Sequence, residues 1–244
     1  MIAATPSPMA APLPASAPDF ASLGIAARLD WAREAFGRTL VATTSFGVQS
    51  ALLLHLLKTH APDIPVVCVD TGYFFPETYQ YADTLQQALG IEVRFYTSSV
   101  TPARMEHTLG RLWSLGEAEK ARYALMRKVE PLDRALREHG ARAWLSGLRR
   151  DQSDERRNRA FVEVQNRTTK IYPILDWTDA QVQAYFHDHQ LPRHPLESRG
   201  FASVGDWHST RKLEPGLRPE DTRANAFGRE CGLHLESNSS DFQI

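Results

Sequence analysis

The sequence has little cysteine and no excess of charge of either sign. Two cysteines, Cys68 and Cys231, occur in 244 residues, and neither belongs to a Cys-x-x-Cys pair. This scarcity argues against a disulfide scaffold and a multi-cysteine metal site, and it favours a reducing compartment. The formal net charge of -1 disfavours a general nucleic-acid binder, which would carry a basic excess. Any anion site must therefore come from local clustering of cations.

Long apolar runs are missing as well. The chain lacks the roughly 18 consecutive apolar residues that a membrane-spanning helix requires. Residues 1–19 are rich in Ala, Pro and Ser and have no basic start, so they predict a disordered tail and not a signal peptide or an anchor. We therefore expect a cytoplasmic protein that has neither a membrane nor a nucleic acid as its partner.

Segments with strand and helix patterns alternate along the middle of the chain. Strands are expected at residues 39–44, 64–69, 91–96 and 144–146. Helices are expected at residues 21–36, 51–57, 76–89 and 117–139, the last with a break or restart at Pro131. Helices between strands imply parallel pairing with right-handed crossovers, so the predicted fold is α/β with a doubly wound, mostly parallel sheet.

The chain length suits one such domain, which we place at residues 20–191. From residue 192 to residue 244 the pattern loses its periodicity and becomes rich in Gly, Pro and charged residues. Long irregular segments of this kind are usually lids or disordered regions. We therefore expect residues 192–244 to form a long loop or flexible C-terminal arm.

Ligands of doubly wound sheets bind beyond the carboxyl ends of the strands, which directs attention to the turns at residues 45–50, 70–72 and 147–150. The first turn, SFGVQS, joins an apolar strand to an apolar helix, where backbone N–H groups and the helix dipole favour an anion. Its small residues Ser45, Gly47 and Ser50 let an oxyanion approach the backbone. An ordinary strand-to-helix turn explains the string about equally well.

The same turn is similar to the Ser-Gly-Gly-x-Asp-Ser loop of the pyrophosphate-loop adenylating enzymes, with two departures. Phe46 stands where that loop has a glycine, and Gln49 stands where it has the aspartate. An amide supplies no charge to hold the magnesium ion that accompanies pyrophosphate. The turn therefore indicates a nucleotide site and disfavours ATP cleavage.

Six strings along the chain resemble the phosphoadenylyl-sulfate reductase family in their order and spacing. They are SFGVQS, VDTGYFFPETY, SGLRRDQS, KIYPILDW, SVGDWHSTRK and GRECGLH, which together extend from about residue 40 to residue 235. The resemblance implies an adenine nucleotide alpha hydrolase-like fold, related to the pyrophosphate-loop enzymes, with a mobile arm that carries the nucleophile. It also implies reduction of 3'-phosphoadenylyl sulfate to sulfite and adenosine 3',5'-bisphosphate in assimilatory sulfate reduction, with thioredoxin as the electron donor.

A related branch, the adenylyl-sulfate reductases, binds a four-iron cluster through a Cys-Cys pair and a later Cys-x-x-Cys. The matching positions in this chain are Tyr123, Ala124, Asp206 and Ser209. Iron–sulfur clusters are held by thiolates, so these positions cannot build that site. The resemblance is therefore to the cluster-free, thioredoxin-dependent branch, which generally prefers the 3'-phosphorylated substrate. We expect no bound cofactor and no metal, since the nine histidines show no metal-ligand spacing.

The two cysteines have different sequence contexts. Cys68 lies in the apolar run 66–69 and is expected to be a core residue. Cys231 lies among polar and ionisable neighbours that can alter the pKa of a thiol, and the resemblance makes it the catalytic nucleophile. Its thiolate would attack the sulfate sulfur and form an S-sulfocysteine, and a thioredoxin thiolate would then release sulfite by forming a mixed disulfide.

Cations near the turns and near Cys231 supply candidates for binding the anionic substrate. Arg149, Arg150 and Arg156 follow a predicted strand end, where guanidinium groups suit phosphate. Asp70 and Thr71 resemble family residues that line the adenosine pocket. For the cationic candidates, including Lys170, a role as a surface or core residue remains open. The predicted substrate-binding residues are Ser45, Phe46, Gly47, Ser50, Asp70, Thr71, Gly147, Arg149, Arg150, Arg156, Lys170, Arg211, Lys212, Arg223, Arg229 and His234.

Three alternatives stay open at this stage. The first is a cluster-free reductase of adenylyl sulfate, and the second is an ATP-dependent adenylyltransferase of the pyrophosphate-loop type. The third is a nucleotide sensor without enzymatic activity. The choice between thioredoxin and glutaredoxin and the presence of a homodimer are also left open.

Overall fold

A six-stranded sheet forms the centre of the computed structural model, which describes residues 17–165 and 168–223. The strand order is β3-β2-β1-β4-β6-β5. Five strands are parallel: β1 (Leu40–Thr44), β2 (Val66–Asp70), β3 (Val93–Thr97), β4 (Ala143–Leu145) and β6 (Thr168–Ile171). The edge strand β5 (Val162–Gln165) runs antiparallel to β6. The order reverses at β1, so the switch point of the sheet lies between β1 and β4.

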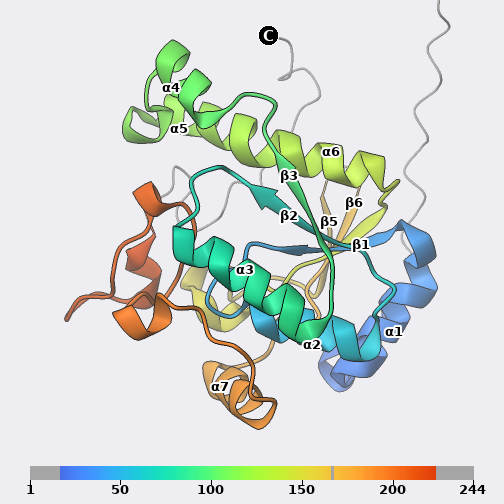
Figure 1. The fold of residues 1–244 in the computed structure, drawn as a ribbon. Helices are drawn as coiled ribbons and strands as arrows, with labels where there is room; N and C mark the ends of the chain where they lie inside the picture. Colours follow the sequence, from blue (N-terminus) through green and yellow to red (C-terminus); the bar gives the residue numbers. More distant parts are fainter. Residues whose placement is uncertain (1–16, 166–167, 224–244) are drawn as a thin grey trace, which may run out of the picture.

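Helices cover both faces of this sheet (Figure 1). On one face lie α1 (Ile25–Phe36), α2 (Ser50–His60) and α3 (Pro76–Leu89), and α6 (Glu130–Glu138) packs on the other. The remaining α-helices are α4 (Pro102–Leu109), α5 (Glu117–Ala124) and α7 (Asp179–Asp188). Successive side chains of β1 point to opposite faces of the sheet. Ala42 joins the core beneath α2, whereas Val41 contacts Leu132 and Leu136 of α6. The predicted doubly wound α/β class is confirmed.

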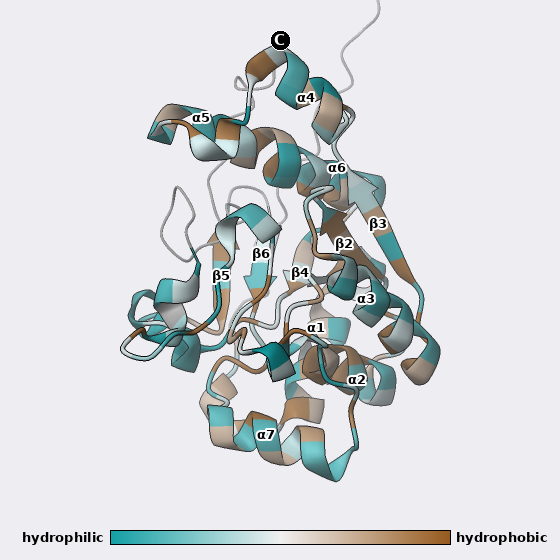
Figure 2. Ribbon diagram, turned by 60° about the vertical axis from the view of Figure 1, so that its left-hand side comes forward, coloured by the Kyte–Doolittle hydropathy of each residue, from teal (hydrophilic) through white to brown (hydrophobic). Residues whose placement is uncertain are grey.

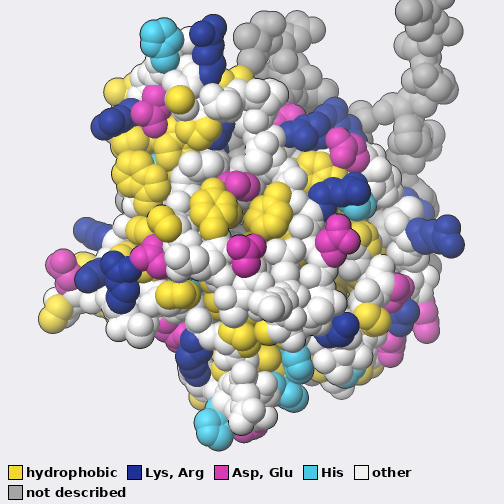
Figure 3. Space-filling view, in the orientation of Figure 1, with side chains coloured by type: hydrophobic (Ala, Val, Ile, Leu, Met, Phe, Trp, Pro, Cys, Tyr) yellow, Lys and Arg dark blue, Asp and Glu magenta, His cyan; other side chains and the backbone are white. Residues whose placement is uncertain are grey.

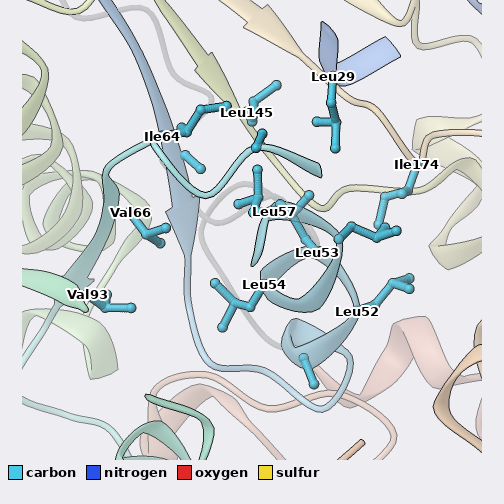
Figure 4. Close-up of a cluster of buried hydrophobic side chains, with 14 of the residues drawn as sticks. Leu29, Leu52, Leu53, Leu54, Leu57, Ile64, Val66, Val93, Leu145 and Ile174 are labelled. Atoms are coloured by element: carbon cyan, nitrogen blue, oxygen red, sulfur yellow. The ribbon is translucent and has the colours of Figure 1, made fainter. Parts of the chain in front are cut away.

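The largest core cluster is built around α2. Leu52, Leu54 and Leu56 of this helix are each at most 1% exposed. Figure 4 shows Leu54 and Leu57 on the side of Val66, Val93 and Leu145 of the sheet, whereas Leu52 and Leu53 lie on the side of Ile174. A helix that is apolar on nearly all sides must be buried, and Figure 2 shows α2 mainly in the hydrophobic colour, whereas α3 and α7 alternate. The core is therefore fixed directly behind the turn that leads into α2.

Cys68 lies on β2 within the same cluster and is fully buried, which confirms its expected place in the core. Burial raises the pKa of its thiol well above the ordinary value, and the negative charge of Asp70 raises it further. The thiolate that a nucleophile needs is thus disfavoured at this position.

The predicted elements agree with the structure to within a few residues, with one correction. The first helix begins at Ile25 and not at residue 21, because Phe20–Ser22 form a separate 3-10 turn capped by the side chain of Asp19. The restart expected at Pro131 within residues 117–139 is confirmed, because α6 begins at Glu130 with Pro131 in its first turn, after a π-helical segment, Leu125–Val129, that the sequence patterns did not predict. The sequence patterns did not predict α4, α7 or the β5–β6 pair.

Residues 192–223, the first part of the expected arm, lie against the carboxyl edge of the sheet. Leu196, Phe201 and Val204 form a small apolar cluster with Val48 and Phe75. In addition, Phe74 and Asp206 form an isolated β-bridge, and the Trp207 amide donates to the Tyr73 carbonyl at 2.9 Å. This segment, orange to red in Figure 1, thereby closes one side of the region beyond β1 and β2. Figure 3 shows the same face of the molecule, on which cationic and acidic side chains are interspersed.

Candidate functional site

A cavity of about 220 Å³ opens at the switch point, beyond the carboxyl ends of β1 and β4. Three segments form most of its wall: the turn after β1, the turn after β4 and the segment 203–206. The first and third face each other, since a β-carbon at Gly47 would lie 3.5 Å from the Val204 carbonyl oxygen. The lining includes Ser45, Gly47, Gln49, Ser50, Thr71, Lys128, Ser146, Gly147, Gln152, Arg156, Ser203, Val204, Gly205, Asp206 and Arg223.

The turn after β1 has a left-handed backbone at its second residue. Phe46 has φ of 48°, a conformation that glycine adopts more readily, and its amide donates to the Thr44 hydroxyl at 3.2 Å. The Phe46 side chain is fully buried and stacks on Phe95 with 5.8 Å between ring centroids. The backbone of this turn therefore has the left-handed conformation that glycine favours, while the Phe46 ring points into the core.

The N-terminus of α2 meets the cavity, because Gln49 and Ser50 both line it. The amides of Ser50 and Leu52 in the first turn of α2 donate to the Gly47 and Gln49 carbonyls at 2.9 and 3.2 Å. The helix dipole adds positive potential at this end, which favours an anionic group of a ligand close to Ser45, Gly47 and Ser50.

Arg149, Arg150 and Arg156 were predicted to bind a substrate phosphate. Of these three, the structure brings Arg156 to the cavity. Arg149 is 1% exposed, and it donates to the Gln49 amide oxygen at 2.7 Å and to the Asp179 carboxylate at 2.5 Å. Arg150 lies over the Phe161 ring and donates to the Arg159 carbonyl at 2.8 Å. Arg149 holds Gln49 in place, whereas Arg150 packs beside the cavity wall.

The remaining predicted cations also divide into two groups. Lys170 is buried behind the wall, with its ammonium 4.3 Å from the centroid of the Trp144 ring. Arg211 donates to the Asp221 carbonyl at 2.9 Å and is exposed, as is Lys212. Arg223 lines the cavity, and a β-carbon at Gly205 would collide with its guanidinium. A residue other than glycine at 205 would therefore displace Arg223.

Asp70 and Thr71 end β2 and have different surroundings. Asp70 accepts from the Gly72 amide at 2.7 Å and from the Tyr79 hydroxyl at 2.9 Å, so its carboxylate shapes the turn. Thr71 lines the cavity and donates through its hydroxyl to Asp206 at 2.5 Å. The turn needs Gly72, whose φ is 73°.

Sequence reasoning missed Lys128 and Asp206 as residues of the site. Their side chains form an ion pair at 2.9 Å, and they are 8% and 2% exposed. Burial would raise the pKa of the Asp206 carboxyl, but the Lys128 ammonium and the hydrogen bonds from Lys128 and Thr71 outweigh it and hold the pKa well below its usual range. The available signal was the placement of Arg127 and Lys128 between apolar residues of a helical string, ALMRKV.

The predicted nucleophile, Cys231, lies outside the described residues, as do Arg229 and His234. The described chain ends at Arg223, which is eight residues before Cys231 in the sequence and lines the cavity. The cavity and the predicted nucleophile are therefore separated by a short stretch of chain.

The four positions that correspond to cluster ligands offer a phenol, a methyl group, a carboxylate and a hydroxyl, and none of these fits an iron–sulfur cluster. Within residues 17–165 and 168–223, no group of three or more His, Cys, Asp or Glu side chains is placed to hold a metal ion. In the same part of the chain, no helix is long and apolar enough to cross a bilayer.

The chain is similar to known proteins over most of its length. The family model for the phosphoadenosine phosphosulfate reductase domain matches residues 39–212. A phosphoadenosine 5'-phosphosulfate reductase of Synechocystis sp. is 48% identical over 209 residues, which cover 85% of this chain and 84% of that protein. A protein of the same name from Cronobacter sakazakii is 45% identical over 213 residues, which cover 87% of each chain.

Two solved structures are similar to this chain at lower sequence identity. The phosphoadenylyl-sulfate reductase of Candida auris, crystallised as a phosphate complex, has a TM-score of 0.69 and 30% identity, with 79% of this chain and 93% of that chain covered. The FMN adenylyltransferase of Candida glabrata has a TM-score of 0.53 and 14% identity, with 86% and 69% covered. The second likeness shows the fold alone.

Proposed function

The chain belongs to the phosphoadenosine phosphosulfate reductase domain family, and we propose that it reduces 3'-phosphoadenylyl sulfate to sulfite and adenosine 3',5'-bisphosphate in assimilatory sulfate reduction. One observation carries the proposal. The cavity lies at the switch point of the sheet and joins the N-terminus of α2 to Lys128, Arg156 and Arg223. Such a site suits a nucleotide with several anionic groups.

The chemical step that we propose uses a thiolate of Cys231. The thiolate attacks the sulfur of the substrate, the bond between sulfur and the bridging oxygen breaks, and the electron pair leaves with the nucleotide phosphate. A thiolate of thioredoxin then attacks the Cys231 sulfur, and sulfite departs with the electron pair of the S–S bond. The second thioredoxin thiol resolves the mixed disulfide, so thioredoxin is oxidised and Cys231 is regenerated.

Both reactants of the first step are anions, so the site has to offset their repulsion with positive charge. We propose that Arg156 and Arg223 do this from the cavity wall, together with Arg229 and His234 of the segment beyond Arg223. The turn at 45–50 would hold a phosphate through its backbone. Arg149, Arg150 and Lys170 would then support the wall and not contact the substrate, since their described partners are protein groups.

The deciding experiment measures sulfite release and nucleotide binding for Cys231→Ser and Cys68→Ala. We expect the first variant to lose sulfite formation while its affinity for adenosine 3',5'-bisphosphate stays within a few-fold, because the thiol makes a bond and does not anchor the nucleotide. Cys68→Ala is the matched control, and it should keep most activity because Cys68 is buried in the core. Equal inactivation of both folded variants would contradict a single nucleophile at Cys231.

The electron donor can be tested with a thioredoxin that lacks its resolving cysteine. Mixed with enzyme that already carries the sulfo group, it should form a covalent complex through Cys231 and release one equivalent of sulfite. Peptide mapping under non-reducing conditions identifies the bond, and a parallel reaction with glutaredoxin compares the two donors. A linkage through Cys68, or sulfite release without a mixed disulfide, would contradict the proposed second step.

The 3'-phosphate separates this proposal from reduction of plain adenylyl sulfate. We expect the 3'-phosphorylated substrate to have a catalytic efficiency at least about tenfold higher, equivalent to roughly 1.4 kcal/mol. Equal efficiencies would favour the other substrate.

An adenylyltransferase would instead incorporate labelled pyrophosphate into ATP, and a sensor would bind nucleotide without any need for Cys231. The scarcity of cysteine supports a cytoplasmic location as part of the same proposal.

A further inference from the structure

A buried polar network surrounds the carboxylate of Asp206 at the edge of the cavity. Its Oδ1 accepts from the Thr71 hydroxyl at 2.5 Å, and its Oδ2 accepts from the Tyr123 hydroxyl at 3.0 Å and from the Lys128 ammonium at 2.9 Å. Asp206 is 2% exposed and lines the cavity. All the donors are buried, so the carboxylate exchanges its water for three protein partners.

The network continues outward through His208. The Nε2 atom of this ring lies 3.0 Å from the Tyr123 hydroxyl, and the ring stacks on Trp113 with 4.5 Å between centroids. Burial lowers the pKa of His208 to about 4, so the ring is neutral near pH 7. Because the single phenol proton of Tyr123 points to Asp206, His208 is the donor in their contact. The charges within the network are therefore those of Asp206 and Lys128.

Three separate parts of the chain meet at this carboxylate. Thr71 follows β2, Tyr123 belongs to α5, and Lys128 lies in the π-helical segment, whereas Asp206 itself belongs to the segment 203–206 that forms one cavity wall. The main chain of Asp206 adds a β-bridge to Phe74, and its carbonyl accepts from Ser209 at 3.1 Å. Since Gly205 precedes Asp206 and underlies the Arg223 guanidinium, the position of Asp206 also sets where Arg223 lies.

We propose that Asp206 is a positioning residue for the reduction, which fixes the wall 203–206 and the overlying Arg223 to β2 and the π-helical segment. The inference rests on the proposed function and deepens it. Tyr123 and Asp206 stand at two of the positions that hold cluster ligands in the related branch, and here a direct hydrogen bond joins them. The link between α5 and the wall is thus made by a phenol and a carboxylate, with Lys128 balancing the charge.

Because Asp206 is charged, its replacement has different effects on nucleotide affinity if the residue has a positioning role than if the structure is lost in general. The cavity is proposed to receive a polyanion, which an adjacent carboxylate repels. Replacing Asp206 by asparagine keeps the side-chain volume and removes that negative charge, so nucleotide binding should stay the same or tighten. The alignment of Arg223 and of the segment that leads to Cys231 should be lost, and misplacement of about 1 Å can lower a rate on the order of 100-fold.

The experiment measures two quantities on the full-length enzyme: the affinity for adenosine 3',5'-bisphosphate, and the single-turnover rate of sulfo transfer to Cys231. For Asp206→Asn we expect an affinity equal to the wild-type value or a few-fold tighter, and a rate lower on the order of 30- to 100-fold. The matched control is Asp188→Asn, the same chemical change at a carboxylate that is 70% exposed at the end of α7, which should alter neither quantity.

If Asp206→Asn does not fold, Tyr123→Phe provides the test, because it removes the hydrogen bonds of the phenol with Asp206 and His208 and leaves the Lys128–Asp206 pair in place. Its rate should fall about 10-fold with unchanged nucleotide affinity. A parallel loss of affinity and rate, or a rate within twofold of wild type in a folded variant, would overturn the inference. Wild-type enzyme that forms no sulfite would instead refute the proposed function, and this inference with it.

Discussion

Replacing Phe46 by glycine should destabilise the protein less than replacing it by alanine, which reverses the usual order of these residues. Both changes remove a fully buried ring that stacks on Phe95. A buried Phe→Ala change costs about 3–5 kcal/mol of unfolding free energy. Alanine, however, keeps the β-carbon that makes the left-handed backbone at φ of 48° unfavourable by about 1–2 kcal/mol. Glycine removes that term.

Against this gain, glycine makes the unfolded chain more flexible, which costs about 0.4–1 kcal/mol. The net expectation is a free energy of unfolding about 0.5–1 kcal/mol higher for Phe46→Gly than for Phe46→Ala. Urea denaturation of wild type and both variants at one pH measures it, provided that the m-values agree. Ala135→Gly within α6 is the control, because there glycine should cost about 1 kcal/mol. A Phe46→Ala variant that is the more stable of the two would refute the backbone argument.

Three further predictions concern the rest of the molecule. Arg28 and Asp176 form a two-point pair at 2.6 and 2.7 Å, and although burial alone would raise the pKa of Asp176, Arg28 lowers it below the usual value. The stability that this pair contributes is present above the unfolded-state pKa and is lost as the pH falls through the folded-state pKa, so the destabilisation of Asp176→Asn should shrink in urea titrations below about pH 4. Gly205→Ala should displace the Arg223 guanidinium and lower the turnover number while the protein remains folded by circular dichroism; unchanged turnover would contradict the placement of Arg223. Anaerobically purified enzyme should contain no stoichiometric iron or acid-labile sulfide by elemental analysis, and full incorporation would refute the cluster-free assignment.

The strands β1, β2 and β4 could be predicted because each has a buried apolar run, as strands covered on both faces do. The β5–β6 pair lacks this signal. Val164 is 60% exposed while Lys170 is buried, so at these two positions hydropathy and burial run opposite. The ammonium of Lys170 lies 4.3 Å from the centroid of the Trp144 ring and 5.4 Å from that of the Tyr172 ring, and a hydropathy pattern cannot predict such contacts.

The helices α4 and α7 were missed for a different reason. Both have clear start signals in the sequence, Thr101 before Pro102 in α4 and the capping box of Thr178 and Gln181 in α7. Their apolar stripes are thin, however: α4 buries Met105 alone among its described residues, and α7 buries Val182 and Phe186. Periodicity alone is a weak signal for such short helices, whose start is marked more clearly by their capping residues.

The three arginines after β4 show where sequence reasoning about the site ends. Arg149, Arg150 and Arg156 have the same chemistry and nearly the same local context. The structure separates them through partners that are distant in sequence or fixed by loop geometry, such as Asp179 for Arg149. A pattern of charges could therefore indicate an anion site, but it could not say which guanidinium faces the cavity.

The side chain of Gln49 connects Arg149 and Asp179 through hydrogen bonds. Its amide oxygen accepts from Arg149 at 2.7 Å, while its amide nitrogen donates to Asp179 at 3.3 Å, so one side chain bridges a cation and an anion. A carboxylate can accept but cannot donate, and at this position it would face the Asp179 carboxylate with like charge. The amide of Gln49 is thus the kind of side chain that the Arg149–Asp179 pair can accommodate. The support of the turn at 45–50 and the absence of a carboxylate from position 49 are consequences of the same amide.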